Sequence, residues 1–302
     1  MSGALGAARA QVAPALAPVA NDWYRANARD FPWRGPHVTP WGTLLIEFMA
    51  QQTQIERAGA VWTRWLERWP TPAALAAASP DEVLRAWGRL GYPRRALALH
   101  RTATEIAERH GGVVPADVAT LLGLPGIGPY TAAAVAAFAY GVRTPVVDTN
   151  IRRVLARAVL GQGEPGAPSA RRDLALMESV LPEDPEEARV TNIAVMEIGA
   201  LVCTARAPRC DACPLAADCA WRAAGYPAYD GPRRARQARF HGSDRQLRGR
   251  IMAQLRAAHR PVPEAELAEL AEDAEQFRRA LAGLVRDGLA TRTPAGYALP
   301  TG

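Results

Sequence analysis

The sequence predicts an all-α protein that ends in a small module of mixed structure. Apolar residues recur at helical spacing through most of the chain, strand-like alternation is rare before residue 285, and glycine or proline punctuates the boundaries. The 302 residues, 49% of them hydrophobic, suffice for one large core or for one core and a small second domain. We therefore expect a helical body followed by a separate C-terminal unit.

Two helices have clear boundaries in the first half of the chain. Ser79 and Glu82 have the spacing of a capping box, so a helix is expected from there to Gly88. A second helix is predicted over about 94–110, where a pair of glycines ends it. An earlier helix is indicated by large apolar side chains that recur at helical spacing: Trp62, Trp65, Leu66 and Trp69.

Residues 1–21 are expected to form a flexible N-terminal tail. The segment is apolar, but Pro14 and Pro18 interrupt it, and it lacks the charged start and cleavage site of a signal peptide. No apolar run is long enough to span a membrane. We therefore expect a cytoplasmic protein, associated with the nucleoid if it binds DNA.

The charge of the chain favours an anionic partner. The formal net charge is +6, and all 36 basic residues are arginines because the sequence contains no lysine. A merely soluble surface would explain the charge equally well. The missing lysine has a firmer consequence, because no side-chain amine is available for Schiff-base catalysis.

The composition changes after the last cysteine. Between Gly231 and Arg260 there are nine arginines and a single acid, Asp244. We interpret 227–245 as an arginine-rich linker and 246–302 as a winged-helix-like module, in which "DGLATRTPAGYALP" forms a β-hairpin. The alternatives are a solvated linker and a helical tail that packs on the body.

All four cysteines lie in one short segment, with the spacing C-x6-C-x2-C-x5-C: Cys203, Cys210, Cys213 and Cys219. Four thiolates so close together in a chain of a reducing compartment indicate a metal site. Structural zinc usually shows two C-x2-C pairs, whereas here only one pair is close. The spacing alone favours an iron–sulfur cluster but leaves zinc open.

The turn "LPGIGPY" precedes an alanine-rich helix. Gly126 and Gly128 allow a close approach to the main chain, whose N–H groups at a helix start can bind a phosphate oxygen. The turn therefore predicts either a helix–hairpin–helix that holds one DNA phosphate or an ordinary helix–turn–helix loop.

Two carboxylates stand out by their surroundings. Glu47 lies in the apolar run "TLLIEFMAQ", so we expect it to be buried, with a raised pKa suited to a general acid, or paired with an arginine. Asp148 precedes a helix and is expected to be its N-cap, which would keep it ionised. A neutral and a charged carboxyl are the pair that glycoside cleavage uses.

In this order, the motifs "EFMAQQTQ", "LGY", "LPGIGPYT", "VVDTN" and the four-cysteine spacing resemble the helix–hairpin–helix DNA glycosylases with an iron–sulfur loop. The resemblance covers roughly residues 22–226. It implies a two-part helical body, a [4Fe–4S] cluster held by the four cysteines, and a hairpin that contacts DNA through Leu124, Gly126 and Gly128.

Two branches of this superfamily differ in chemistry. The endonuclease III-like lyases carry a lysine at the position of Tyr130, and this chain has none. The other branch, the MutY adenine glycosylases, carries a glutamate at the position of Glu47 and an adenine-pocket segment similar to "FPWR". The resemblance therefore implies a monofunctional glycosylase that removes adenine mispaired with guanine or 8-oxoguanine.

The resemblance also implies catalytic roles. Glu47 would protonate N7 of a flipped-out adenine, and Asp148 would stabilise the sugar cation that forms when the base leaves. Tyr130 and Asn150 would orient these groups, and water would complete the hydrolysis.

Other positions are implied to bind the substrate, which is double-stranded DNA with an A·G or A·8-oxoG mispair. Trp33 and Arg34 would line the adenine pocket, and Gln52 and Tyr92 would fill the gap in the base stack. We expect the protein to act as a monomer.

The chain departs from the MutY pattern at several places. Pro93 stands where many relatives have a second tyrosine, Thr149 stands where glycine is usual, and Ile193 stands where relatives carry a glutamine or glutamate. The C-terminal residues are too few for the Nudix-like domain that reads 8-oxoguanine. Two alternatives remain: a mismatch glycosylase for thymine or uracil, and a non-enzymatic DNA-binding protein with a structural metal.

Overall fold

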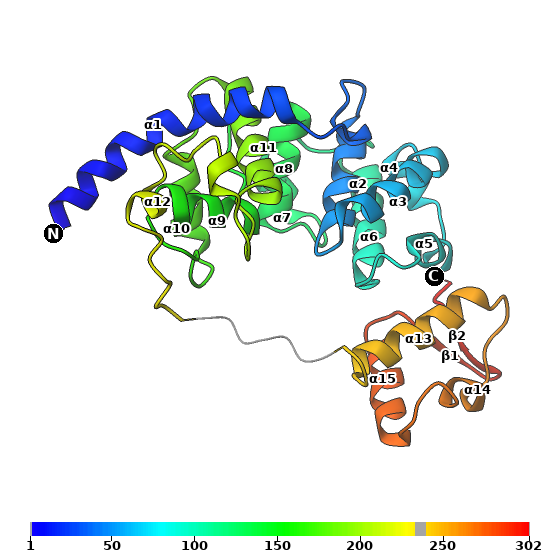
Figure 1. Cartoon of the computed structure of the whole chain (residues 1–302). Helices are drawn as coiled ribbons and strands as arrows, with labels where there is room; N and C mark the ends of the chain where they lie inside the picture. Colours follow the sequence, from blue (N-terminus) through cyan, green and yellow to red (C-terminus); the bar gives the residue numbers. More distant parts are fainter. Residues whose placement is uncertain (1, 233–239, 302) are drawn as a thin grey trace. The chain divides into compact units, whose positions relative to one another are not determined.

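The computed structural model describes residues 2–232 and 240–301, and the side chains from residue 15 onward (Figure 1). The chain divides into two compact units, and each is built from segments far apart in the sequence. Unit 1 comprises Met1–Phe31, Ala116–Ala119 and Gly128–Ala235, and unit 2 comprises Pro32–Pro115, Thr120–Ile127 and Arg236–Gly302. The all-α expectation is confirmed, with one small two-stranded sheet.

Unit 1 is built around α11, against which α1 and α9 pack. Its core includes Leu16 and Ala20 of α1, Leu155 of α9 and Ile198 of α11. Its elements are α1 (Ser2–Asn27), α8 (Pro129–Tyr140), α9 (Thr149–Ala158), α10 (Ala170–Glu178), α11 (Pro185–Leu201), η2 (Cys210–Ala212) and α12 (Ala220–Ala223).

The expectation of a flexible tail is wrong for residues 15–21, whose side chains pack into the core. The helix α1 runs through both prolines, and Leu16 and Ala20 are buried against α11. Asn21 is also buried and donates a hydrogen bond to Glu187 Oε2 at 2.8 Å. Tertiary packing therefore outweighs the helix-breaking tendency of proline in this segment.

Unit 2 begins with a helical array in which α4 packs on α6, and α2 packs on α3. Its aromatic side chains interlock, as in the edge-to-face pair Trp65 and Trp87, whose ring centroids lie 5.6 Å apart. The predicted capping box at Ser79 and Glu82 is confirmed. The elements are η1 (Pro32–Arg34), α2 (Pro40–Ala50), α3 (Ile55–Arg68), α4 (Pro72–Ala76), α5 (Pro80–Trp87) and α6 (Arg94–Arg109). The helix α7 (Val118–Gly123) joins the two units along the chain.

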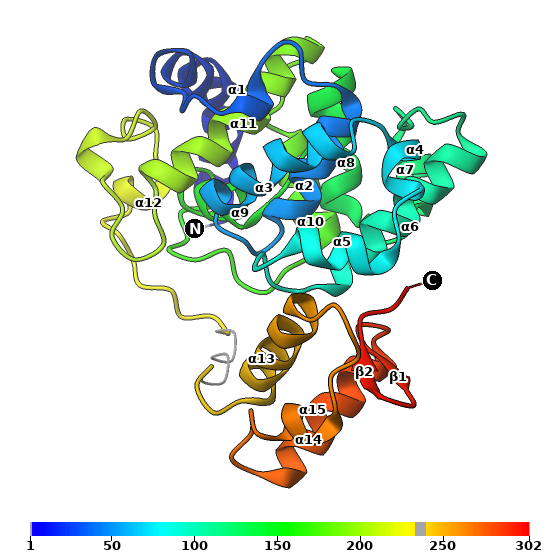
Figure 2. The same ribbon diagram turned by 90° about the vertical axis from the view of Figure 1, so that its right-hand side faces the viewer.

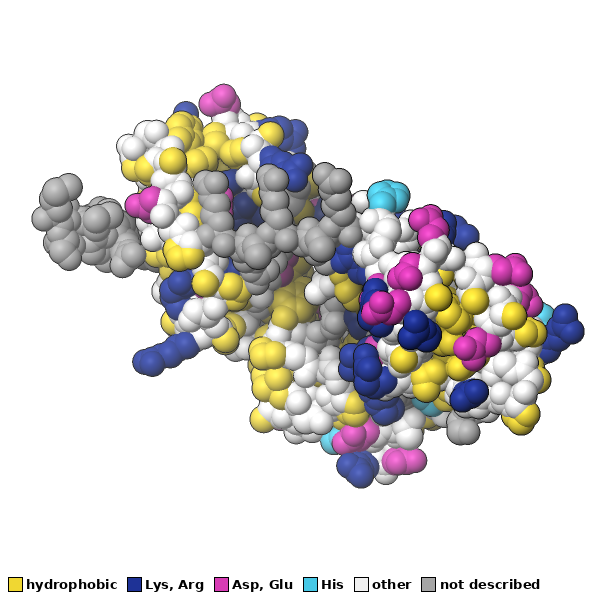
Figure 3. Space-filling model, turned by 90° about the horizontal axis from the view of Figure 1, so that it is seen from below, with side chains coloured by type: hydrophobic (Ala, Val, Ile, Leu, Met, Phe, Trp, Pro, Cys, Tyr) yellow, Lys and Arg dark blue, Asp and Glu magenta, His cyan; other side chains and the backbone are white. Residues whose placement is uncertain are grey.

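The C-terminal module completes unit 2. Its helices α13 and α15 pack side by side, and the expected hairpin follows them (Figure 2). Thr291 pairs with Ala298, and Val262 forms a bridge with Tyr297. The elements are α13 (Asp244–Ala257), α14 (Glu264–Ala268), α15 (Ala274–Arg286), β1 (Thr291–Thr293) and β2 (Gly296–Ala298). Arginine and acidic side chains are interspersed on its surface (Figure 3).

The predicted linker lies partly outside the described residues, which omit 233–239 and therefore Arg233, Arg234, Arg236 and Arg239. The helix α13 begins at Asp244, inside the predicted linker. In the part of the chain that the structure describes, no helix is long and apolar enough to cross a membrane.

Candidate functional site

Asp148 is the N-cap of α9, as the sequence predicts. Its Oδ1 accepts a hydrogen bond from the Ile151 main-chain N–H at 2.7 Å, and its Oδ2 accepts one from Asn150 Nδ2 at 2.8 Å. Both carboxylate oxygens are therefore held by short hydrogen bonds at the start of a helix.

The pKa of Asp148 differs from the expectation. Burial raises the pKa of this carboxyl above its ordinary value of 3.8, whereas the hydrogen bonds from Ile151 and Asn150 and the charge of Arg153 lower it. The helix start acts in the expected direction, but the loss of hydration outweighs it. The residue types around Asp148 in the sequence do not show how deeply it is buried.

Asn150 is held in turn by Arg153, which the sequence did not single out. Arg153 Nη2 donates to Asn150 Oδ1 at 2.8 Å and to the Gly199 carbonyl at 2.6 Å. Its Nε donates to the Cys203 carbonyl at 2.7 Å. Arg153 thus connects the Asp148–Asn150 pair with the first cysteine of the metal-binding loop.

Gly199 allows the helices that carry these groups to approach each other. A Cβ atom at this position would lie 2.7 Å from Asn150 Cβ and 3.0 Å from the Asn150 carbonyl oxygen. A glycine in the last turn of α11 is therefore required by the close contact with α9.

Tyr130 lies in the first turn of α8 and packs against a small core cluster that includes Ala134 and Val146. Val146 is two residues before Asp148, and its main-chain N–H donates to Asn192 Oδ1 at 2.8 Å. The same cluster therefore supports both Tyr130 and the segment that leads to Asp148.

Two positions related to adenine recognition in the sequence argument also lie in unit 1. Ile193 is buried in α11 and carries no polar group. Glu197, one turn later, is 1% exposed and forms a bidentate pair with Arg29, with distances of 2.7 and 3.0 Å. Glu197 therefore has a structural partner within its own unit.

Glu47 lies on α2 of unit 2, where its surroundings are less closed than expected. The residues Trp41–Phe48 are otherwise buried, but Glu47 itself is partly exposed. The expectation of a buried Glu47 is therefore wrong. The apolar run packs the helix on either side of it, while Glu47 itself keeps part of its surface exposed.

The segment with Trp33 and Arg34 forms the short helix η1, which contacts α2. The Trp33 ring lies edge-to-face with Trp62 at a centroid distance of 6.1 Å. It also covers Gly59, where any Cβ atom would collide with the ring. The pocket residues predicted from "FPWR" therefore share unit 2 with Glu47, with Trp33 fixed against α3.

Gln52 and Tyr92 lie on two exposed turns with unusual main-chain geometry. Their φ angles are 55° and 47°, which non-glycine residues rarely adopt. The Tyr92 side chain is 48% exposed. Two exposed side chains on strained turns are suited to contact a ligand, and such strain is typical of functional positions.

Arg95, which the sequence did not single out, ties these two turns together. Its guanidinium donates to the Gln51 carbonyl and, at 3.2 Å, to the Gly91 carbonyl. It also lies 5.3 Å from the centroid of the Tyr92 ring. Burial lowers the pKa of Arg95 to about 10. Its only sequence signal was its place directly after the "GYPR" turn.

The hairpin between α7 and α8 has the backbone that its glycines suggest. Gly126 has φ 76°, and a Cβ atom there would lie 2.7 Å from Ala98 Cβ. Gly128 is the N-cap of α8 and has open space around its Cα. Leu124 is buried, so only its main chain is available for a DNA contact.

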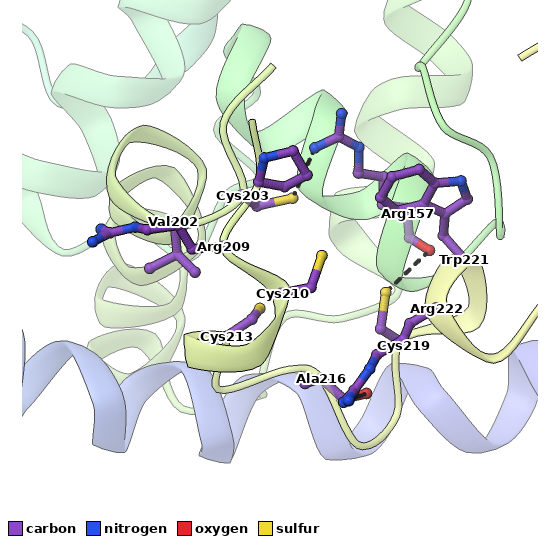
Figure 4. A pocket seen from close by; sticks show the side chains of 11 residues that line it. Arg157, Val202, Cys203, Arg209, Cys210, Cys213, Ala216, Cys219, Trp221 and Arg222 are labelled. Carbon is purple, nitrogen blue, oxygen red and sulfur yellow. Dashed lines mark hydrogen bonds between the residues drawn. The ribbon is translucent and has the colours of Figure 1, made fainter. Parts of the chain in front are cut away.

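The four cysteines line one pocket, together with Arg157 and Trp221 (Figure 4). Burial, together with the charges of the three other cysteines, raises the pKa of the Cys213 thiol to about 11. Among the described residues, no three potential ligands converge on a position for a single ion. Four thiols around a shared space fit an iron–sulfur cluster by donor type and number.

Arg157 fixes the wall of this pocket. It is 5% exposed and donates to the Thr204 carbonyl at 2.8 Å and to Cys203 Sγ at 3.4 Å. Its guanidinium stacks 4.8 Å from the Trp221 ring centroid. The metal-binding loop is therefore held to α9 by the hydrogen bonds of one buried arginine.

Two family models match the chain. Residues 45–178 match the HhH-GPD superfamily of base excision DNA repair proteins, and residues 203–219 match the iron–sulfur binding domain of endonuclease III. The chain therefore carries a [4Fe–4S] site formed by its four cysteines.

Two actinobacterial relatives match over nearly the whole chain, and a third relative matches about two thirds of it. The adenine DNA glycosylase of Mycobacterium tuberculosis is 56% identical over 92% of this chain and 91% of its own length. That of Mycolicibacterium smegmatis is 52% identical over 91% of this chain and 92% of its own length. A thymine/uracil-DNA glycosylase of Pyrobaculum aerophilum is 34% identical over 64% of this chain and 85% of its own length.

Solved structures show the same fold. A thermostable thymine-DNA glycosylase superposes with a TM-score of 0.65 at 24% identity, over 71% of this chain and 98% of that chain. A trapped endonuclease III–DNA covalent intermediate superposes with a TM-score of 0.61 at 23% identity, over 70% of this chain and 96% of that chain.

Proposed function

The chain belongs to the adenine DNA glycosylase family, and from this membership we propose that it hydrolyses the N-glycosidic bond of adenine mispaired with guanine or 8-oxoguanine in double-stranded DNA. The observation that carries the reaction type is the Asp148 carboxylate, fixed at both oxygens, in a chain without lysine. No side-chain amine can attack the sugar, so water is the final nucleophile.

Glu47 is proposed as the general acid. It would donate its proton to N7 of the flipped-out adenine, which makes the base a neutral leaving group. Its partial exposure supports this role, because a carboxyl group that must reach a base cannot be enclosed in the core. Trp33 and Arg34 are proposed to hold the base, on the short helix η1 that contacts the helix of Glu47.

Asp148 is proposed to stabilise the oxocarbenium-like cation that remains on the sugar. Asn150 would hold the carboxylate in place through its 2.8 Å hydrogen bond, and Tyr130 would help to orient the sugar. After water adds to the anomeric carbon, its proton leaves and an abasic site remains. Only the ionised carboxylate of Asp148 can stabilise the sugar cation, so its raised pKa predicts a loss of activity in acid.

DNA contacts are proposed at three exposed places. The hairpin would hold a phosphate through the main-chain N–H groups around Gly126 and Gly128. Gln52 and Tyr92 would enter the gap that the flipped base leaves in the stack, and their strained turns support an inserting role. The cluster, held by the four cysteines, would shape the loop that follows α11.

The test is single-turnover excision on duplexes with A·G, A·8-oxoG, A·C, T·G or A·T, each with and without alkali. We expect adenine loss opposite guanine or 8-oxoguanine, with strand breaks mainly after alkali. Glu47→Gln should bind these duplexes but react about 10²–10⁴-fold more slowly. Glu67→Gln, on the exposed face of α3, is the matched control.

Two results would contradict the proposal. Near wild-type turnover by Glu47→Gln would remove Glu47 as the acid. Cleavage of T·G in place of the adenine mispairs would assign the chain the substrate of its thymine-specific relatives.

A further inference from the structure

A groove in unit 2 is lined by arginines from two distant parts of the sequence. One wall is the connection between α5 and α6, and the other is α13 of the C-terminal module. Among the described residues that line it, seven are arginines and none is acidic. Dark blue side chains gather in one band at an edge of this module in the view from below (Figure 3).

The helix α13 presents a regular face to this groove. At about 100° per residue, Arg245, Gly249, Met252 and Arg256 fall on one side of the helix. All four line the groove. Gly249 is exposed, and a Cβ atom there would meet no other atom within 4 Å. The middle of this face is therefore open to a large ligand.

The positively charged arginines in the groove repel one another. Burial lowers the pKa of Arg256, and the positive charge of Arg89 on the opposite wall lowers it further. No hydrogen bond or ion pair to the side chain of Arg89 or Arg256 occurs among the described residues. An anion in the groove would relieve this repulsion.

The two walls are tied to each other by other arginines. Arg85 of α5 donates to the main-chain carbonyls of Arg256 and, at 2.8 Å, of Ala258. Arg94 of α6 lies 3.5 Å from Asp287, which also pairs with Arg248 of α13. The groove is therefore a formed feature, built with arginines that are already satisfied by protein acceptors.

Gln52 and Tyr92 line the same groove. It therefore leads directly to the two strained turns that we expect to enter the DNA stack. We propose that the groove binds the sugar–phosphate backbone of the substrate duplex next to the mispair, with Arg89, Arg245 and Arg256 neutralising phosphates. This inference rests on the proposed function, and it gives the C-terminal module a DNA-binding role.

The test measures equilibrium binding to a duplex that cannot react, in which an abasic-site analogue lies opposite guanine. Binding is measured by fluorescence anisotropy at several salt concentrations. Each lost phosphate contact reduces the slope of log K against log[salt] by about 0.9. Binding should therefore be weaker in the triple variant Arg89→Gln, Arg245→Gln and Arg256→Gln, and the magnitude of its slope should be smaller by about 2–3.

A matched control removes the same charge elsewhere on the module. Arg260→Gln, Arg278→Gln and Arg292→Gln are exposed substitutions outside the groove. We expect this control to keep a slope within about 1 of the wild type. Equal slopes for the two triple variants would overturn the proposal, because net charge alone would then explain the binding.

A single substitution tests the groove without removing an arginine. Gly249→Glu improves helix propensity, so α13 should fold at least as well. It also places a negative side chain in the open centre of the face. We expect at least tenfold weaker DNA binding, whereas Gly249→Ala should bind as the wild type does. Wild-type affinity of Gly249→Glu would contradict the proposal.

These measurements are independent of catalysis. If the wild type removes no adenine but the groove variant shows the expected reduction in salt dependence, the proposed function is refuted and the groove is supported. If the wild type removes adenine but the groove variant and the control variant have equal slopes, the proposed function is supported and the groove is refuted.

Discussion

The contact between α9 and α11 at Gly199 predicts a sharp response to one methyl group. Gly199→Ala would place a Cβ atom 2.7 Å from Asn150 Cβ and 3.1 Å from the Asn150 carbonyl carbon. Part of this obstacle is main chain, which cannot rotate away as a long side chain can. The helix α9 must therefore shift, and with it the hydrogen bonds between Asn150 and Asp148.

The size of the effect follows from two opposing contributions. Overpacking of a tight contact costs about 1–3 kcal/mol, and replacing a glycine by alanine within a helix returns about 0.5–1 kcal/mol. We expect Gly199→Ala to lower the free energy of unfolding by about 1–2 kcal/mol, because the obstacle is rigid. The excision rate should fall by at least tenfold, because a shift of α9 disturbs the hydrogen bonds that hold the Asp148 carboxylate.

The assay combines urea denaturation with single-turnover excision of adenine. Gly249→Ala is the matched substitution, because it also lies within a helix but meets no atom within 4 Å. It should raise the free energy of unfolding by about 0.5–1 kcal/mol and leave the excision rate unchanged. The reasoning is refuted if both alanine variants are stabilised and both keep the wild-type rate.

Three further predictions follow from the geometry. Because burial raises the pKa of Asp148, the folded state binds its proton more tightly than the unfolded state, and stability falls as pH rises through the interval above 3.8. Asp148→Asn should therefore gain more stability over the wild type at pH 7.5 than at pH 3, below the ordinary pKa, measured by denaturation, and an equal gain at both values would contradict the pKa shift. Arg157→Leu removes donors to three carbonyls and one cysteine sulfur, so we expect loss of absorbance near 400 nm and of bound iron, while the exposed Arg206→Gln should keep both. Gly126→Ala places a Cβ atom 2.7 Å from Ala98 at a φ of 76°, so it should weaken binding of unreactive duplex and lower the melting temperature, whereas Gly128→Ala should leave the melting temperature unchanged.

Local features could be predicted from the sequence because nearby residues determine them. The capping box at Ser79, the N-cap at Asp148 and the hairpin around residues 291–298 all depend on side chains within a few positions. The cysteine spacing likewise fixed the metal-binding loop, since all four ligands lie within one short segment.

Features that depend on distant segments could not be predicted in this way. The helix α1 packs its Leu16 into the core that α11 shares, and Asp148 has a raised pKa because it is buried in the fold. Arg95 and Arg153 hold functional turns through main-chain carbonyls, which leave no trace in residue type. Glu47 is partly exposed within an otherwise buried stretch of α2, and the apolar run of the sequence did not indicate this.

The pairing of α1 with α11 sets the order in which a growing chain can complete its parts. Asn21 and its partner Glu187 are 166 positions apart. At about 5–20 residues per second, α1 therefore leaves the ribosome roughly 8–33 s before the surface that will cover Leu16. Meanwhile α2 to α6 are contiguous and can pack among themselves as they emerge. The nascent protein thus assembles from the middle of its sequence, and its first helix is among the last pieces to find its place.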